Sequence, residues 1–286
     1  MLREIHHSGA FHWPNKMRTA VNLTFDFQGG EDVRPGKDGK IDHEEYTQCE
    51  YGPNTAIWRI LRILDEEGVK ATFNTCGGIA ERYPEAVKAL VERGHEIAGH
   101  GYHHEVARDL TRDQENDVMR RTRAMIKERT GRDIKGWRSC TQSPNSIELL
   151  MSHGILWNSN SFSHDMPFLW ESDGGYLVEL PRQPYGDGRT YQHRANDSGN
   201  PADTLLVWKS MFDCFYAESK AAGAYVPFQF HPYISGRPGR AETLQAIIHH
   251  MKKEGVWIAP ASEIAEWTRD HVFKLKADKP ALQFAS

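Results

Sequence analysis

The stretch "AVNLTFDFQGG", residues 20–30, begins with an apolar run and ends in a carboxylate, a glutamine and two glycines. An apolar run with few charges that stops at turn residues is typical of a strand buried on both faces. Such strands occur in parallel sheets whose two faces are covered by helices. The stretch therefore predicts a strand over 20–27 of an α/β fold, with Asp26 at its carboxyl end.

An alternation of helices and strands continues from this strand to the end of the chain. Apolar residues at helical spacing, between a proline and a glycine, predict a helix over 53–68. We predict further helices over 80–94, 111–131, 143–154, 202–222, 240–255 and 260–270, and further strands over 69–74, 95–99, 134–137, 155–159, 176–181, 225–230 and 256–259. This alternation favours a distorted (β/α)7-8 barrel over a doubly wound open sheet, because no GxGxxG motif follows the first strand.

Length and composition point to one domain with a real core. The chain has 286 residues, of which 39% are hydrophobic. We expect a single domain over 1–286, with an N-terminal arm over about 1–17 and a C-terminal tail over about 271–286. The net charge of −4 indicates neither a nucleic-acid nor a membrane partner. Four widely spaced cysteines, no apolar leader and no long apolar run predict a cytoplasmic protein with reduced thiols.

Ionisable side chains stand at the carboxyl ends of several predicted strands. They are Asp26, His100, Arg138 and His231, with His104 just beyond His100. In a (β/α) barrel these strand ends meet at one rim, where catalytic residues lie. A charged or imidazole side chain is costly at a buried strand end unless it is paired or functional. We therefore expect these five side chains to surround one site.

The pair of histidines in "HGYHH" (100–104) has the spacing of metal ligands. Three residues separate His100 from His104, so a turn or a tight loop can direct both rings at one ion. A carboxylate from another strand would complete three ligands and leave one position for water. The pattern is equally compatible with a solvated loop whose histidines bond to the backbone, because H-x-x-x-H alone is a weak signal.

The other three candidates also have two interpretations each. Asp26 either caps a turn before the glycines or serves as a base or ligand at the strand end, which we favour. Arg138 is either a surface ion-pair residue or the group that orients a catalytic carboxylate. His231, between an apolar strand and Pro232, is either a core histidine or a fixed ring that protonates a leaving nitrogen.

Four motifs together resemble the polysaccharide deacetylase superfamily in their order and spacing. They are "LTFDF" (23–27), "HEIAGHGYHHE" (95–105), "GWRSCTQSPNS" (136–146) and "FQFHPYISGRPGR" (228–240). The similarity extends over roughly residues 18–270. Three further stretches are similar to the intracellular branch that contains peptidoglycan-deacetylase-like proteins, deacetylase-type allantoinases and cyclic imide hydrolases. They are "QGGE" (28–31), "EYG" (50–52) and "SNSFSHDMPFLW" (159–170).

The resemblance implies a distorted barrel that hydrolyses carbon–nitrogen amide bonds with a divalent metal, usually zinc. It assigns these roles: base to Asp26, metal ligation to His100 and His104, general acid to His231, and orientation of the base to Arg138.

The sequence departs from the family pattern at one point. The family's metal-binding aspartate is expected directly after the base or one residue later, where this chain has Phe27 and Gln28. An amide oxygen is a weaker ligand for zinc than a carboxylate. Either Asp26 binds the metal itself, or Gln28 substitutes for the aspartate, or the site works without tight metal. We favour a metal held by Asp26 with the two histidines.

The resulting hypothesis is hydrolysis by metal-activated water, with Asp26 as base and His231 as acid. A small cyclic amide or imide is the favoured substrate, because polysaccharides lie outside the cytoplasm. An aromatic-rich stretch over 161–176 is expected to wall the pocket. The candidate substrate-binding residues are Gln28, Glu31, Phe168 and Trp170.

Two alternatives stay open at this point. One is N-deacetylation of an acetylated sugar, a peptidoglycan fragment or an amine. The other is a non-catalytic small-molecule binding protein on the same barrel, since fold does not fix function. The branch resemblance also implies a homo-oligomer, with a tetramer favoured.

Overall fold

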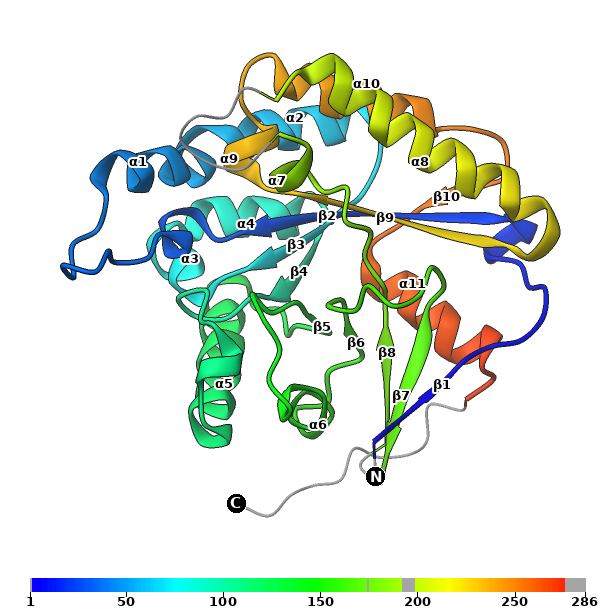
Figure 1. The fold of residues 1–286 in the computed structure, drawn as a ribbon, viewed down its shortest axis with the longest axis horizontal. Helices are drawn as coiled ribbons and strands as arrows, with labels where there is room; N and C mark the ends of the chain where they lie inside the picture. Colours follow the sequence, from blue (N-terminus) through cyan, green and yellow to red (C-terminus); the bar gives the residue numbers. More distant parts are fainter. Residues whose placement is uncertain (1, 174, 192–198, 276–286) are drawn as a thin grey trace.

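The structure is a computed structural model that describes residues 2–173, 175–191 and 199–275. Its centre is a curved 10-stranded sheet in the order β1-β7-β8-β6-β5-β4-β3-β2-β10, with β9 paired to β2 (Figure 1). The strands are β1 (Arg3–Ile5), β2 (Thr19–Phe27), β3 (Thr72–Thr75), β4 (Glu96–Gly99), β5 (Gly136–Trp137), β6 (Trp157–Asn158), β7 (Phe168–Ser172), β8 (Gly175–Glu179), β9 (Ala224–Phe230) and β10 (Val256–Ile258).

Helices follow most of these strands and pack on the outside of the sheet. They are α1 (His43–Tyr51), α2 (Ile57–Glu67), α3 (Gly77–Arg82), α4 (Pro84–Glu92), α5 (Arg112–Thr130), α6 (Ser146–Ser152), α7 (Asp187–Thr190), α8 (Pro201–Ala222), α9 (Pro232–Ser235), α10 (Arg240–Met251) and α11 (Ala261–Trp267). The 3-10 turns are η1 (Pro14–Lys16), η2 (Gly29–Asp32) and η4 (Ala107–Asp109), and the π-helical turns are η3 (Gly52–Ala56) and η5 (Thr268–Val272). In Figure 1, α2, α8 and α10 lie above β2 and β9, and α5 and α6 lie below.

The predicted α/β fold around a parallel sheet is confirmed. Strand β2 pairs in parallel with β3, β9 and β10, and the parallel ladder continues through β4, β5, β6 and β8. Strands β7 and β1 then pair antiparallel at the far edge. Among the described strands no pairing joins β1 to β9, so hydrogen bonds do not close the sheet into a complete barrel between these two strands. The predicted N-terminal arm is therefore partly a strand, and the predicted C-terminal tail lies mostly outside the described residues.

Aromatic side chains fix the relative positions of the central strands. Phe25 of β2 stacks on Phe73 of β3 at 4.9 Å between ring centroids and lies 5.2 Å from Phe230 of β9. All three rings are completely buried. Burying one large side chain contributes about 1.5–3 kcal/mol, so this cluster holds β2 firmly between its neighbours.

Two glycines in the sheet each lie beneath a tryptophan of the next strand. A β-carbon on Gly99 of β4 would come within 2.1 Å of the Trp137 ring of β5. Likewise a β-carbon on Gly136 of β5 would come within 1.8 Å of the Trp157 ring of β6. Only glycine leaves space for an indole so close to the backbone. The two tryptophans are thereby seated against the neighbouring strand just before Arg138.

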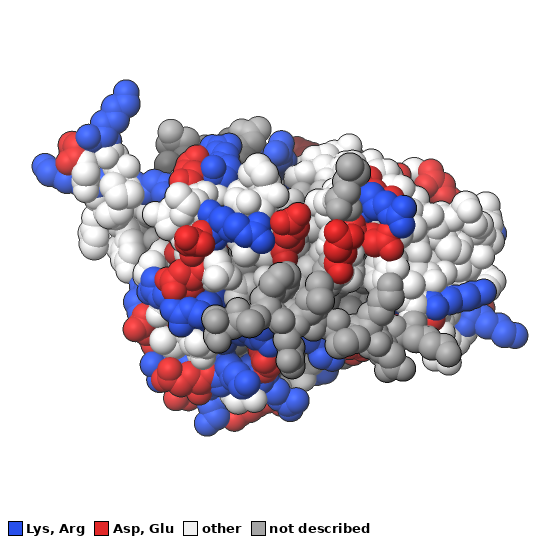
Figure 2. All heavy atoms as spheres, turned by 90° about the horizontal axis from the view of Figure 1, so that it is seen from below, with Lys and Arg blue, Asp and Glu red and all other residues white. Residues whose placement is uncertain are grey.

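The surface carries charges of both signs. On the face seen in Figure 2, Lys and Arg side chains alternate with Asp and Glu side chains over much of the visible area. Among the described residues, no helix combines the length and the apolar character needed to cross a membrane.

Candidate active site

Asp26 lies near the carboxyl end of β2 and accepts hydrogen bonds from three side chains. Its Oδ1 accepts from Asn74 Nδ2 at 2.7 Å and from Arg138 Nη1 at 3.0 Å. Its Oδ2 accepts from Gln229 Nε2 at 2.5 Å. The strand register explains two of these contacts, because Asp26 pairs with Asn74, and Gln229 pairs with the nearby Thr24. The carboxylate is therefore held from both neighbouring strands.

Arg138, directly after β5, is the charged partner of this carboxylate. Its side chain is 1% exposed, and four of its five N–H groups have identified acceptors. Besides Asp26, it donates to the Ser159 carbonyl at 3.1 Å, to Ser159 Oγ at 2.9 Å and to Thr24 Oγ1 at 3.2 Å. Burial alone would raise the pKa of Asp26, but the Arg138 charge and the nearby histidines outweigh it and hold that pKa well below its usual range.

His231 follows β9 and points its second ring nitrogen at Asp26. Its Nδ1 lies 2.6 Å from Asp187 Oδ1, and its Nε2 lies 3.9 Å from Asp26 Oδ2. The Asp187 carboxylate, buried in α7, also accepts from the His231 backbone N–H and from Ser235 Oγ, each at 2.7 Å. Burial lowers the pKa of His231, but the negative charge of Asp187 outweighs that effect and raises it.

His100 follows β4 and has one ring nitrogen committed to the backbone. Its Nδ1 lies 2.6 Å from the Arg138 carbonyl oxygen, so Nδ1 carries the proton and Nε2 carries the lone pair. That Nε2 is buried and has no hydrogen-bond partner among the described residues. Burial lowers the pKa of His100 to about 3, so the ring is neutral at physiological pH.

His104 lies beside a carboxylate that the sequence motifs do not point to. Its Nδ1 is 3.0 Å from Asp32 Oδ1, and its ring centroid is 4.7 Å from that of His100. The backbone of His104 adopts φ 54, a left-handed conformation, and Arg34 donates to its carbonyl oxygen. Burial lowers the pKa of His104, but Asp32 and the Cys140 thiol outweigh it and raise the pKa to about 9.

The short 3-10 turn η2 brings Asp32 back to this histidine. Tyr233 of α9 donates to Asp32 Oδ2 at 3.1 Å, so the carboxylate is fixed from the side opposite His104. Asp32 is six residues beyond Asp26, outside the positions where the family pattern expects its metal-binding aspartate. The structure thus places Asp32, rather than Asp26 or Gln28, against His104.

Asp32, His100 and His104 fit the ligand set of a divalent metal. Two imidazoles and a carboxylate are a common set for zinc, and a ligating histidine usually donates its other N–H to a carbonyl, as His100 does. The orphaned, buried Nε2 of His100 has the lone pair that a metal requires. With His100 and His104, neither Asp26 nor Asp32 completes a group in which all ligand atoms lie within 4.8 Å of one another. Binding would therefore need a small movement of these side chains.

The four predicted substrate-binding residues lie in different surroundings. Gln28 is buried next to the site, and its Oε1 has no hydrogen-bond partner among the described residues. Glu31 is bound by Arg82 and His103, at 2.7 and 2.8 Å. Phe168 is completely buried, and its ring packs 5.4 Å from that of Trp170. The indole N–H of Trp170 donates to the carboxylate of the buried Glu179 at 3.0 Å.

Comparisons with known proteins concern the family and the fold of this chain. The family described as "Polysaccharide deacetylase" matches residues 46–151. A solved Mycobacterium smegmatis structure, assigned as a polysaccharide deacetylase, is 28% identical and superposes with a TM-score of 0.85 over 99% of both chains. These similarities support the assignment of the chain to the polysaccharide deacetylase superfamily.

Two other known proteins are similar to this chain over most of their length. The peptidoglycan deacetylase of Helicobacter pylori is 27% identical over 264 residues, which cover 80% of this chain and 88% of that protein. The solved structure of Puue allantoinase is 25% identical and has a TM-score of 0.83, covering 91% of this chain and 93% of the other. Together these similarities support a hydrolase that acts on carbon–nitrogen bonds other than peptide bonds.

Proposed function

We propose that this polysaccharide deacetylase homologue opens the ring of a small cyclic amide or imide by hydrolysis. The observation that supports it most directly is the opposition of Asp26 and His231 across 3.9 Å. One is a carboxylate whose pKa is lowered, and the other is an imidazole whose pKa is raised. Two neighbouring groups whose environments push their pKa values apart are suited to act as base and acid.

In the proposed mechanism, Asp26 orients the attacking water and receives its proton. Arg138 and Asn74 keep the carboxylate in one orientation, which favours a single direction of attack. His231 is protonated at Nε2 and donates that proton to the departing ring nitrogen. Asp187 stabilises the imidazolium before the transfer and fixes which nitrogen faces the substrate.

A strongly acidic carboxylate is a weak base, so Asp26 needs help in activating water. We propose that Asp32, His100 and His104 hold a divalent metal, with zinc favoured by its nitrogen and oxygen ligands. A bound metal of this kind supplies a Lewis acid that acidifies water and polarises a carbonyl. With such a metal bound, Asp26 would only have to accept a proton from water that is more acidic than bulk water.

Arg182 supports an imide-like substrate with two carbonyl oxygens. Its Nη1 donates to Gln229 Oε1 at 3.2 Å, and the same Gln229 donates to Asp26, so the guanidinium lies one residue from the reaction centre. Its Nε is buried and has no hydrogen-bond partner among the described residues. Burial and the Arg138 charge lower the pKa of Arg182 to about 9, which leaves it protonated at neutral pH. A second carbonyl, or the carboxylate formed on ring opening, would satisfy this donor.

Deacetylation is the second candidate, favoured by the family match and by the peptidoglycan deacetylase relative. It uses the same base and acid, but its substrate has one carbonyl at the reacting group and leaves an amine. It gives no specific role to Arg182, whereas the imide proposal does.

The test is a hydrolysis assay with succinimide, hydantoin, allantoin and an N-acetyl sugar as separate substrates. The proposal expects turnover of at least one cyclic compound, with a higher kcat/KM than for the N-acetyl sugar. An Arg182→Met variant should lose kcat/KM for the cyclic substrate by about tenfold to hundredfold, the effect of one charged hydrogen bond. Arg189→Met, which changes a more exposed arginine nearby, is the matched control. Turnover of the N-acetyl sugar alone would support deacetylation, and turnover of none of the four would favour a binding protein.

A further inference from the structure

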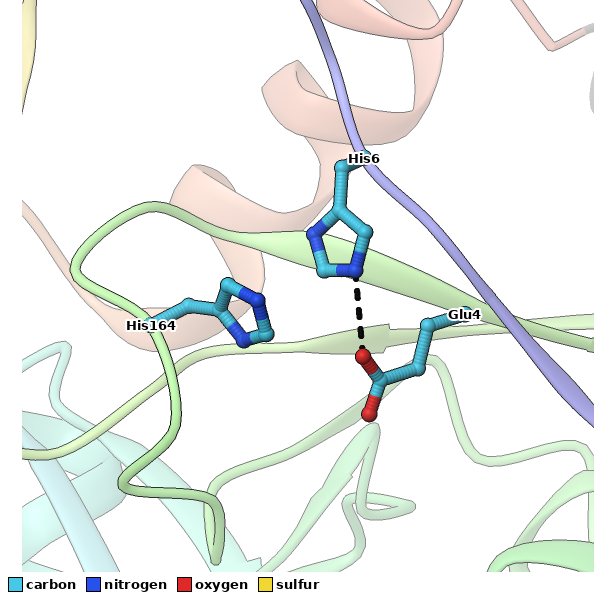
Figure 3. A group of neighbouring side chains, drawn as sticks. All are labelled: Glu4, His6 and His164. Carbon is cyan, nitrogen blue, oxygen red and sulfur yellow. Dashed lines mark hydrogen bonds and ion pairs between the residues drawn. The ribbon is translucent and has the colours of Figure 1, made fainter.

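A second group of metal-ligating side chains lies at the edge of the sheet, away from Asp26 and His231. Strand β1 pairs antiparallel with β7 in the register Glu4↔Trp170 and Ile5↔Leu169. Because side chains alternate along a strand, Glu4 and His6 project on the same side of β1. Figure 3 shows both converging with His164, which lies on the loop before β7.

The three side chains are close enough to share one ion. His6 Nε2 lies 3.0 Å from Glu4 Oε2, and the His6 and His164 ring centroids are 4.2 Å apart. One ligand atom from each residue lies within 4.8 Å of those of the other two. Among residues 2–173, 175–191 and 199–275, this is the one group of three or more such side chains that meets the condition. Two imidazole nitrogens and a carboxylate oxygen form a set that suits zinc.

The surroundings of the two histidines favour ligation. Ser163 Oγ lies 2.7 Å from His164 Nδ1, which leaves Nε2 of that ring for a metal. A histidine that binds zinc commonly has such a hydrogen-bond partner at its other ring nitrogen. Phe168 packs against both rings, 5.0 Å from His6 and 5.1 Å from His164, and is itself completely buried. A cavity of about 540 Å³ borders both histidines and would admit a water as fourth ligand.

We propose that Glu4, His6 and His164 form a second divalent-metal site of the zinc type. Without an ion, the group consists of an exposed ion pair and a second ring, with side-chain exposures of 43% for His6 and 33% for Glu4. An exposed pair of this kind contributes little to the stability of the fold. A shared ion would instead fasten the N-terminal strand to the loop that leads into β7. The site is structural, and it requires nothing from the proposed hydrolysis.

The test is zinc titration of the metal-free full-length protein against a competing chelating dye. The His6→Ala and His164→Ala variants should each bind one equivalent fewer than the parent, or bind it at least about tenfold more weakly. His7→Ala, which borders the same cavity, should keep the parental stoichiometry and affinity. Parental zinc binding by both His6→Ala and His164→Ala would overturn the proposal.

A second comparison separates this site from the catalytic one. His100→Ala should still bind the one equivalent of zinc that belongs to Glu4, His6 and His164. The double variant His100→Ala with His164→Ala should lose it. Zinc should also raise the Tm of His100→Ala but not that of the double variant, which guards against misfolding as the cause. If the catalytic site binds no metal, the parent will bind one equivalent and His164→Ala none. Equal zinc binding by His100→Ala and the double variant would contradict the outer site.

Discussion

The two histidine clusters of this protein differ in what holds them in place. In the proposed active site, His100 and His231 are buried, and one ring nitrogen of each lies within hydrogen-bond distance of an identified acceptor. At the edge of the sheet, the His6 side chain is 43% exposed, and its Nε2 lies 3.0 Å from Glu4 Oε2. In the buried cluster the protein itself fixes the charge and orientation of each ring. In the exposed cluster Ser163 holds one nitrogen of His164, and a bound ion would be needed to fix all three side chains together.

The largest effect should come from removing the proposed acid of the buried cluster. His231→Ala is expected to lower kcat by about two to four decades, the usual cost of losing general acid catalysis. His249→Ala removes a histidine whose side chain is 80% exposed, and kcat should stay within about twofold. Steady-state kinetics on the substrate that is turned over would check both. Near-parental kcat for His231→Ala would remove this residue from the mechanism.

Breaking the buried ion pair should cost more stability than breaking an exposed one. Arg138→Met leaves Asp26 charged, buried and without its cation, so the free energy of unfolding should fall by about 3–5 kcal/mol. Arg62→Met breaks the ion pair of Arg62 with Glu66, two side chains that are 61% and 45% exposed. The free energy of unfolding should fall by about 0.5 kcal/mol or less. Urea denaturation followed by circular dichroism measures both values. Similar losses in the two variants would mean that burial does not distinguish these pairs.

Removing the carboxylate beside His104 tests which aspartate serves the catalytic metal. Asp32→Asn should weaken zinc binding at that site and lower kcat/KM, each by about tenfold to hundredfold. Asp38→Asn changes an exposed loop residue of the same charge and should leave both values unchanged. Zinc affinity and kinetics are measured in the His164→Ala background, so that the proposed site of Glu4, His6 and His164 does not contribute to the zinc bound. Unchanged zinc binding in Asp32→Asn would return the ligand role to Asp26.

The smallest effect in the series is a shift in pH dependence. His231 acts in its protonated form, and Asp187 raises its pKa, so activity should persist to higher pH and fall as pH rises through that raised value. Asp187→Asn removes this support and should move the alkaline limb of kcat/KM to lower pH. Asp213→Asn, which breaks the exposed pair with His250, should leave the limb in place. An unmoved limb in Asp187→Asn would assign that limb to another group.

Much of the fold follows from patterns visible in the sequence. The apolar run over 20–27 is strand β2, and the helix expected over 202–222 is α8 (Pro201–Ala222). Strands β1 and β7 were not predicted, because β1 is short and polar and gains its pairing only from a distant segment. Helix α1 also escaped prediction, since its sequence "HEEYTQCEY" has almost no apolar face.

The site was predictable where residues stand at strand ends and less so where loops return to it. The structure gathers Asp26, Arg138 and His231, as their strand-end positions predicted. Asp32 and Asp187 lie in a 3-10 turn and a short helix, where an acidic residue ordinarily reads as a turn or cap. No local signal shows that such a residue folds back onto a histidine far away in the sequence. The burial of Phe168 was not predictable either, because an aromatic run does not tell which face of its strand is buried.

The two glycines beneath tryptophans have a consequence for how this barrel tolerates change. Gly136 lies two residues before Arg138, and an added methyl group there would push the Trp157 ring away from β5. Any shift of that short strand carries the guanidinium with it, and the carboxylate of Asp26 loses its alignment. A single glycine thus sets the position of the buried Arg138 guanidinium. Sequence drift should be free on the outer helical surfaces and nearly forbidden at Gly99 and Gly136.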